Sequence, residues 1–125
     1  MTIQGLAYMN QCLEDLGIPY EYMMWTGDLQ DPYFVGEYSE IQTDNEDGLI
    51  ESDFILTGTT KQTYLGLEEI KEQIRNYFTC DGLTDIMENG WGIAISYETA
   101  FPVPSIEEGI SRINITLRVK EWKGE

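Results

Sequence analysis

The fold is decided by one stretch near the C-terminal end, Arg112-Ile113-Asn114-Ile115-Thr116-Leu117-Arg118-Val119-Lys120. Apolar residues occupy every second position, and polar or basic residues occupy the positions between them. This period of two predicts a β-strand with one apolar face and one polar, basic face. A strand of this kind needs other elements of the chain to cover its apolar face.

Two further strands are predicted as an antiparallel pair. Tyr33–Ile41 and Ile50–Thr57 are rich in aromatic and β-branched residues, and the acidic, turn-forming segment Thr43–Gly48 joins them. Strands that are adjacent in sequence and joined by a turn-rich loop pair as a hairpin. Gly36 inside the first strand indicates a bulge or a close backbone approach. The acidic segment would form the tip of the hairpin.

The remaining strands are predicted on either side of these two. Tyr20–Trp25 is an aromatic run followed by turn residues up to Pro32, and Trp91–Phe101 alternates apolar with small residues. Pro102 and Pro104 are expected to end the latter strand. No regular element is expected between Cys80 and Gly90, because turn-forming residues lie at both ends of that segment.

Two amphipathic helices are predicted. Residues 3–16 place apolar side chains at spacings of three and four, with Thr2 as the N-cap and Gly17 and Pro19 at the C-terminal end. Residues 64–78 carry a second apolar stripe, and the polar run Thr57–Thr63 reads as the connection before it. The element order is therefore α-β-β-β-α-β-β. It indicates a single α+β domain over residues 1–125, with a mainly antiparallel sheet and two helices packed on one face.

Charge excludes several functional classes. The chain has 125 residues with 23 acidic and 7 basic side chains, no histidine and a formal net charge of −16. Without histidine there is no imidazole base and no His-ligated zinc. Such an acidic chain does not bind a phosphate backbone by counterion release. We also expect no membrane span and no secretory signal, and we expect Cys12 and Cys80 to be reduced thiols.

No motif indicates catalysis or a cofactor. The acidic segment fails as a calcium loop, because alignment on Gly48 puts Thr43 at the first position and Phe54 where a glutamate is required. Gly58-Thr59-Thr60-Lys61 lacks the spacing of a phosphate-binding loop. The tyrosines of the first half could stack on nucleic-acid bases, but no basic groove accompanies them. We therefore expect these side chains to pack in the core and on the surface of the sheet. We therefore expect no enzyme activity, no metal and no cofactor.

Four segments in order resemble the small tail-terminator (tail-completion) proteins of long-tailed bacteriophages and prophages. They are Leu13–Tyr22, Asp31–Tyr38, Asp53–Thr59 and Leu67–Ile74, and the run Pro32-Tyr33-Phe34-Val35 before an acidic turn is the most specific. The resemblance implies a homohexameric ring that caps the tail tube, ends its polymerisation and joins tail to head. It also implies contacts with tail-tube and head-completion proteins, passage of DNA without specific binding, and a place in the virion after assembly in the host cytoplasm.

Two residue sets follow as hypotheses. Clustered acidic residues are candidates for the lumen or face of a ring: Asp44, Glu46, Asp47, Glu51 and Asp53. Arg112, Arg118 and Lys120 lie in a locally basic stretch and are candidates for the contact with the acidic half of a neighbouring subunit. The same charge leaves an alternative open, an acidic mimic of DNA that inhibits a host nucleic-acid-binding enzyme. A small carboxylate-based enzyme is the third reading.

Overall fold

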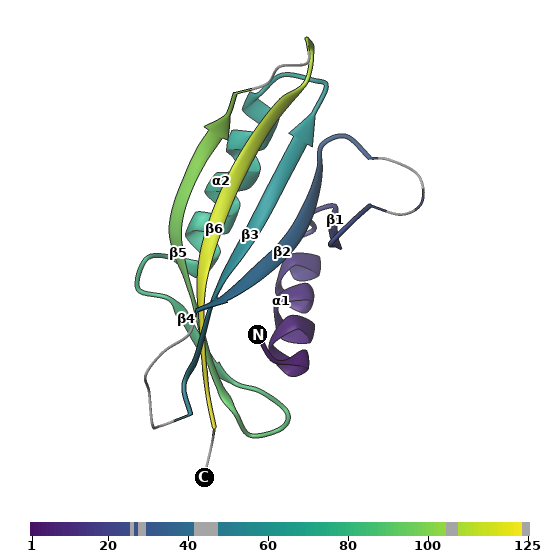
Figure 1. Cartoon of the computed structure of the whole chain (residues 1–125). Helices are drawn as coiled ribbons and strands as arrows, with labels where there is room; N and C mark the ends of the chain where they lie inside the picture. Colours follow the sequence, from purple (N-terminus) through teal and green to yellow (C-terminus); the bar gives the residue numbers. More distant parts are fainter. Residues whose placement is uncertain (26, 28–29, 42–47, 105–107, 124–125) are drawn as a thin grey trace.

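A computed structural model describes residues 1–125 apart from 26, 28–29, 42–47, 105–107 and 124–125. Its elements are α1 (Ile3–Asp15), β1 (Tyr20–Tyr22), β2 (Tyr33–Ile41), β3 (Ile50–Thr60), α2 (Leu65–Phe78), β4 (Leu83–Ile86), β5 (Gly92–Val103) and β6 (Ser111–Trp122). The protein is α+β, as predicted, and its described residues form two helices and one sheet. Figure 1 shows that the sheet is curled. It has one more strand than the predicted order contains.

The six strands lie in the order β1-β2-β3-β6-β5-β4. All neighbours are antiparallel except β1 and β2, which run parallel. The predicted hairpin is confirmed, since β2 pairs with β3 from Tyr33 opposite Thr59 to Ile41 opposite Glu51. The last strand in sequence, β6, lies in the middle of the sheet between β3 and β5. It is therefore the strand that holds the two halves of the sheet together.

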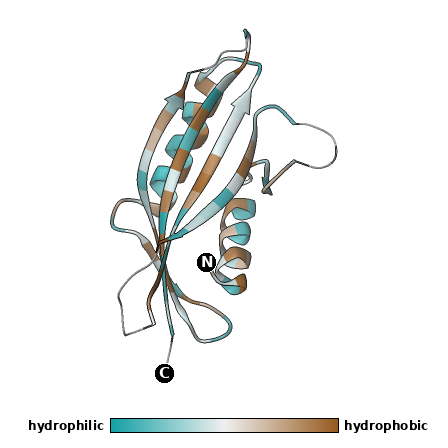
Figure 2. Ribbon diagram, in the orientation of Figure 1, coloured by the Kyte–Doolittle hydropathy of each residue, from teal (hydrophilic) through white to brown (hydrophobic). Residues whose placement is uncertain are grey.

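The apolar face of β6 lies in the core, as its alternation predicts. Ile113, Ile115, Leu117 and Val119 are buried, and Figure 2 shows hydrophobic and hydrophilic residues alternating along this strand. Phe54 of β3 lies opposite Leu117 and extends the same buried row. Helix α2 packs against β3, β5 and β6, and its own core residues are Leu67, Ile74 and Phe78.

Both ends of α1 have the capping structure that the sequence predicts. The side chain of Thr2 accepts a hydrogen bond from the backbone N–H of Gly5. At the other end Gly17 adopts a positive φ of 74°. The N–H of Gly17 donates to the carbonyl of Glu14, and that of Ile18 donates to the carbonyl of Leu13. These two bonds form a Schellman motif, which satisfies the last carbonyls of the helix.

A buried carboxylate connects the beginning of α1 to β6. Glu121 is fully buried, and it accepts hydrogen bonds from the backbone N–H of Thr2 (3.1 Å) and from the Thr2 hydroxyl. A Cβ on Gly5 would lie only 2.6 Å from a carboxylate oxygen of Glu121. Gly5, which has no side chain, therefore leaves the space that this carboxylate occupies. A negative charge at a helix N-terminus is also favoured by the helix dipole.

The first predicted strand was too long, because β1 ends at Tyr22 and not at Trp25. Three other predicted boundaries were also wrong. First, β3 continues through Thr60, so residues 57–60 belong to a strand and not to the connection before α2. Second, the segment predicted to lack regular structure contains β4, which pairs with Gly92–Ile95 of β5. Third, β5 continues through Pro102 to Val103. Beyond Ile95 this strand has β6 as its only strand neighbour among the described residues, and a proline is tolerated at a sheet edge.

Gly36 lies at a close approach and not at a bulge. The pairing of β2 with β3 is continuous across it, and a Cβ here would lie 2.6 Å from the Tyr20 ring and 2.7 Å from the Phe54 ring. Gly58 makes similar room for the ring of Phe34, which lies opposite it. These two glycines let three aromatic rings, those of Tyr20, Phe34 and Phe54, lie close to the backbone. At Gly36 this room lets the Tyr20 ring pack over β2 and against Phe54 of β3, where Tyr20 is partly buried.

Candidate functional site: a groove along the free edge of β1

The first strand of the sheet, β1, has one paired edge and one free edge. The N–H of Phe34 donates to the carbonyl of Pro19, and the N–H of Met23 donates to the carbonyl of Gly36, both at 2.8 Å. Backbone groups of successive residues in a strand point to opposite edges. Pro19, Glu21 and Met23 therefore face β2, whereas the backbone groups of Tyr20 and Tyr22 point to the free edge.

A tight turn ends β1. Met23 has a φ of 70°, and the N–H of Met24 donates to the carbonyl of Tyr22 at 2.8 Å. A hydrogen bond across three residues with a positive φ in the middle is a γ-turn, a strained conformation for a residue with a side chain. The turn satisfies the carbonyl of Tyr22 and exposes both methionine side chains, which are 59% and 67% accessible. The free edge is therefore short and ends sharply.

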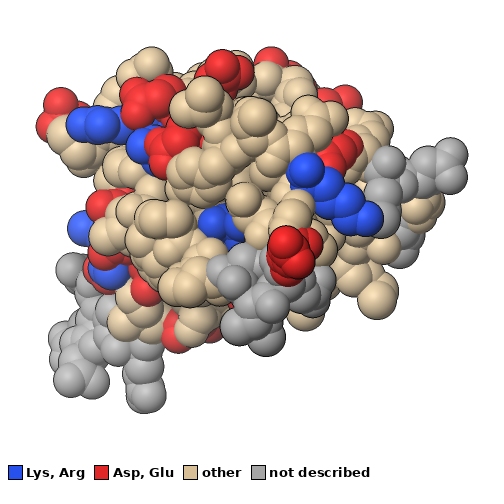
Figure 3. Space-filling model, turned by 90° about the horizontal axis from the view of Figure 1, so that it is seen from above, with Lys and Arg blue, Asp and Glu red and all other residues tan. Residues whose placement is uncertain are grey.

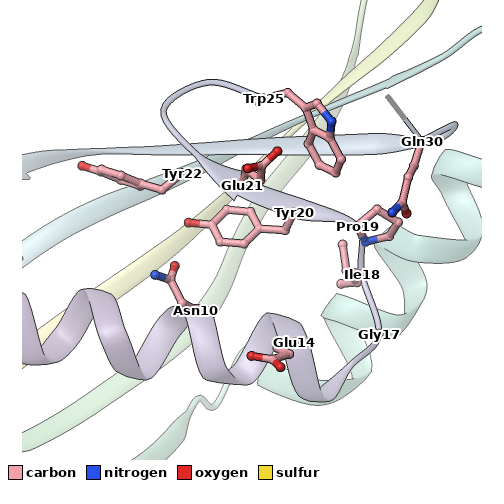
Figure 4. A pocket seen from close by; sticks show the side chains of 10 residues that line it. All are labelled: Asn10, Glu14, Gly17, Ile18, Pro19, Tyr20, Glu21, Tyr22, Trp25 and Gln30. Atoms are coloured by element: carbon pink, nitrogen blue, oxygen red, sulfur yellow. The ribbon is translucent and has the colours of Figure 1, made fainter. Parts of the chain in front are cut away.

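A groove of about 530 Å³ follows this free edge. Six consecutive residues, Gly17–Tyr22, line it together with Asn10 and Glu14 of α1 and with Trp25 and Gln30. Figure 4 shows Asn10 projecting from the helix toward the ring of Tyr20, with Glu14 further along the helix and Tyr22 further along the strand. The helix thus forms one wall of the groove, and the strand forms its floor.

Tyr20 is anchored in the groove by its ring, but its hydroxyl has no partner. The ring packs against Phe54, with centroids 6.2 Å apart. The hydroxyl oxygen is buried and makes no hydrogen bond with any part of the chain that the structure describes. Burial raises the pKa of this phenol, and the neighbouring Tyr22 adds to the rise. A buried hydroxyl without a partner costs about 1–3 kcal/mol, so a hydrogen-bond donor that reached this atom would recover part of that cost.

The lining of the groove is aromatic and acidic. Glu14 and Glu21 supply two carboxylates, and no lysine or arginine is among the described residues that line the groove. Trp25 lies 5.6 Å from the ring of Tyr33, and Tyr22 stacks on Tyr38 with centroids 6.4 Å apart. Aromatic faces and carboxylates both attract cations. This combination favours a positively charged ligand.

A second charged cluster lies on the face of the sheet that points away from the core. Arg118 of β6 contacts Asp53 at 2.9 Å, Glu98 at 3.0 Å and Glu51 at 3.4 Å. Partial burial acts to lower the pKa of this arginine, but the three carboxylates act more strongly in the opposite direction. The pKa of Arg118 is therefore raised above its usual value. The cluster joins β3, β6 and the bulge of β5 between Tyr97 and Thr99. It neutralises part of the acidic charge on this face.

The structure places the predicted site residues in three different settings. Glu51, Asp53 and Arg118, which were assigned to two separate surfaces, contact one another within one chain. Lys120 is exposed and lies in register between Glu51 and Ala94. The acidic residues of the hairpin tip lie outside the described residues: Asp44, Glu46 and Asp47.

Arg112 lies at the end of the sheet where β3 ends and β6 begins. It lines a cavity of about 450 Å³ together with Asp31, Tyr33, Thr59 and Lys61. Figure 3 looks onto this end of the molecule and shows basic side chains lying between acidic ones. The locally basic stretch of the sequence is thus divided between this end and the outward face of the sheet.

Sequence reasoning missed the groove, although it noted its aromatic residues. The tyrosines drew attention as a stacking platform, and they were read as packing residues. The parallel pairing of β1 with β2 creates the free edge. Nothing in the alternation of Tyr20 to Trp25 reveals that pairing. The signal available in the sequence was the aromatic run Tyr20–Trp25, with Glu14 and Glu21 nearby and no lysine or arginine close to it.

The groups that could carry chemistry are few. Cys12 is buried and Cys80 is exposed, and both are free thiols. The described residues contain no group of three Asp, Glu or Cys side chains that could hold a metal ion. Within the same residues, neither helix has the length and apolar character needed to cross a bilayer. No protein-family model matches the chain, and no similar sequence was found among curated proteins.

Proposed function

We propose that this protein is a non-enzymatic assembly subunit of the tail-terminator type. In this proposal several copies, six by the resemblance, form a ring that caps a phage or prophage tail tube. The ring ends tube polymerisation and contacts head-completion proteins, in the virion after assembly in the host cytoplasm. DNA passes through the ring without specific binding.

The observation that carries the proposal is the sheet face that points away from the core. In our proposal both helices pack on the opposite face, so this face and the strand edges are left for neighbouring molecules. The Arg118 cluster crosses three strands of the face and keeps its charges paired. A sheet with an uncovered face and free edges is suited to repeated protein contacts.

The three basic residues of the predicted interface differ in whether they already contact a carboxylate of their own chain. Arg118 already contacts carboxylates of its own chain, so it is a weak candidate for contact with a neighbour. Arg112 and Lys120 make no ion pair with any described residue. We therefore assign the contact with the acidic half of a neighbouring subunit to these two, in a head-to-tail arrangement that closes into a ring.

The proposal is tested by adding the purified protein to polymerising tail-tube protein encoded in the same gene cluster. Electron microscopy should show tubes that are shorter and that end in a ring. Arg112→Glu should lose much of this capping, because it places a carboxylate against an acidic neighbour. Arg75→Glu on α2 is the matched control, since Arg75 is exposed and the charge change is identical.

Two results would count against the proposal. Tubes of unchanged length and without end rings would exclude capping. Tight binding to a DNA-processing enzyme, displaced by duplex DNA, would instead identify the protein as a DNA mimic.

A further inference from the structure

We propose that the groove along β1 binds an extended, basic segment of a different protein, which adds to the sheet as a seventh strand. The segment would pair with the free edge of β1 and place a lysine or arginine side chain between the groove carboxylates. The groove can bind such a segment whether the protein is a single subunit or part of a ring.

The backbone of β1 offers the hydrogen bonds that strand addition needs. The N–H and carbonyl of Tyr20 and the N–H of Tyr22 point to the free edge, two residues apart. Among the described residues no other strand pairs with this edge, because β1 has β2 as its only neighbour in the sheet. An added strand gains affinity from such main-chain bonds and gains specificity from the side chains that alternate along it.

The side chains of the groove select a cation. Glu14 and Asn10 line it from α1, and Tyr20 and Tyr22 present aromatic rings from the strand (Figure 4). The hydroxyl of Tyr20 has no partner among the described residues, and it would accept a hydrogen bond from a guanidinium or ammonium group that reached it. Stacking on an aromatic ring further favours arginine.

A second copy of this chain is a poor occupant. Within the described residues, the other strand at an end of the sheet is β4, and it carries Asp85 between Asp81 and Glu88. Pairing β4 with β1 would bring these carboxylates against Glu14 and Glu21. In addition, the N–H of Ile86 is already bonded to the side chain of Asp85 at 2.8 Å. Nucleic acid is excluded by like charge, so a basic polypeptide is the occupant that fits.

Strand addition can be separated from simple charge attraction with matched peptides. The probe is a short, blocked peptide in which arginine alternates with valine. Its twin has the same sequence and charge but carries N-methyl groups on alternate backbone amides, which removes the donors that a strand needs. We expect calorimetry to show that the twin binds at least about tenfold more weakly, which corresponds to one or two lost hydrogen bonds.

Variants locate the site. Glu14→Gln should weaken binding of the unmodified peptide about threefold to tenfold, whereas Glu69→Gln on α2 should leave it unchanged. Both glutamates are exposed helix residues, so the change in net charge and the setting are matched. Tyr20→Phe should fold normally and bind about tenfold more weakly, because it lacks the hydroxyl acceptor. Bound peptide should also slow hydrogen exchange at the amides of Tyr20 and Tyr22.

Three results would overturn the proposal. Equal affinity of the two peptides would mean that a basic peptide is merely attracted to an acidic protein. Equal effects of Glu14→Gln and Glu69→Gln would place binding elsewhere. Unchanged exchange at Tyr20 and Tyr22 with the peptide at saturation would show that the edge of β1 stays free. Each result is independent of tail-tube capping, which the earlier experiment measures.

Discussion

Gly5 leaves the space that the carboxylate of Glu121 fills. Substitution of this helix glycine should therefore destabilise the protein. Alanine is normally the better helix former by up to about 1 kcal/mol. At Gly5, however, a methyl group would lie 2.6 Å from the carboxylate, so we expect Gly5→Ala to lower the free energy of unfolding by about 1–3 kcal/mol. Urea denaturation with an unchanged m-value measures this.

Gly66→Ala is the control for that prediction. Gly66 lies in the first turn of α2, and nothing comes within 4 Å of the position that its Cβ would occupy. The same substitution should therefore be neutral or stabilising by up to about 1 kcal/mol. Equal effects at the two glycines would show that Glu121 moves freely and is not held against α1.

Tyr20 should make stability depend on alkaline pH. Its pKa is raised by burial, so above about pH 10 the unfolded chain ionises this phenol while the folded protein keeps it neutral. The unfolded state then binds fewer protons, and stability falls as pH rises. We expect Tyr20→Phe to reduce that slope by up to about 1.4 kcal/mol per pH unit. Urea titrations at neutral and alkaline pH measure it, and an identical slope in both proteins would contradict it.

Among the elements, β4 and β6 should differ most in local stability. β6 pairs over eleven positions with β3 and as many with β5, whereas β4 pairs over four positions with β5. Local opening follows the number of buried contacts that an element makes. We expect amides of β6 to exchange only by global unfolding and amides of β4 to exchange much faster, as measured by native-state hydrogen exchange. Uniform protection across both strands would contradict this.

The elements that can be predicted from the sequence are those in which apolar residues recur at the spacing of a strand or of a helix. β6, β3 and both helices were predicted because burial falls on every second residue or on one helical stripe. β4 was missed because three of its four residues are exposed, so no apolar face marks it, and its strand form depends on pairing with β5. The extension of β5 through Pro102 was missed because proline is harmless only where the neighbouring strand has already ended.

For the whole molecule, the net charge of −16 predicts a response to salt. Excess like charge destabilises the compact state, and salt screens it over about 10 Å at 0.1 M. We expect the urea midpoint to rise between 10 mM and about 0.5 M NaCl. Contacts between subunits that depend on opposite charges should weaken over the same range, which sedimentation velocity measures. A midpoint that falls with salt would show that ion pairs such as those of Arg118 outweigh the repulsion.

The candidate site was harder to predict than the fold, because it depends on distant parts of the chain. Charge clustering identified Glu51, Asp53 and Arg118 as notable, but the register of β3 with β6 decides that they contact one another. The groove likewise depends on the parallel pairing of Tyr20–Tyr22 with Phe34–Gly36. Register and pairing across a sheet are set by packing of the whole domain, so local patterns do not contain them.

The place of β6 in the sheet also has a consequence for synthesis on the ribosome. The strand is translated after the other helices and strands that the structure describes, yet it must insert between β3 and β5 and bring Glu121 to the first turn of α1. Until it leaves the exit tunnel, β3 has no partner on one side and the two halves of the sheet cannot join. The nascent chain should therefore remain sensitive to protease until β6 has emerged, and it should then become resistant in a single step.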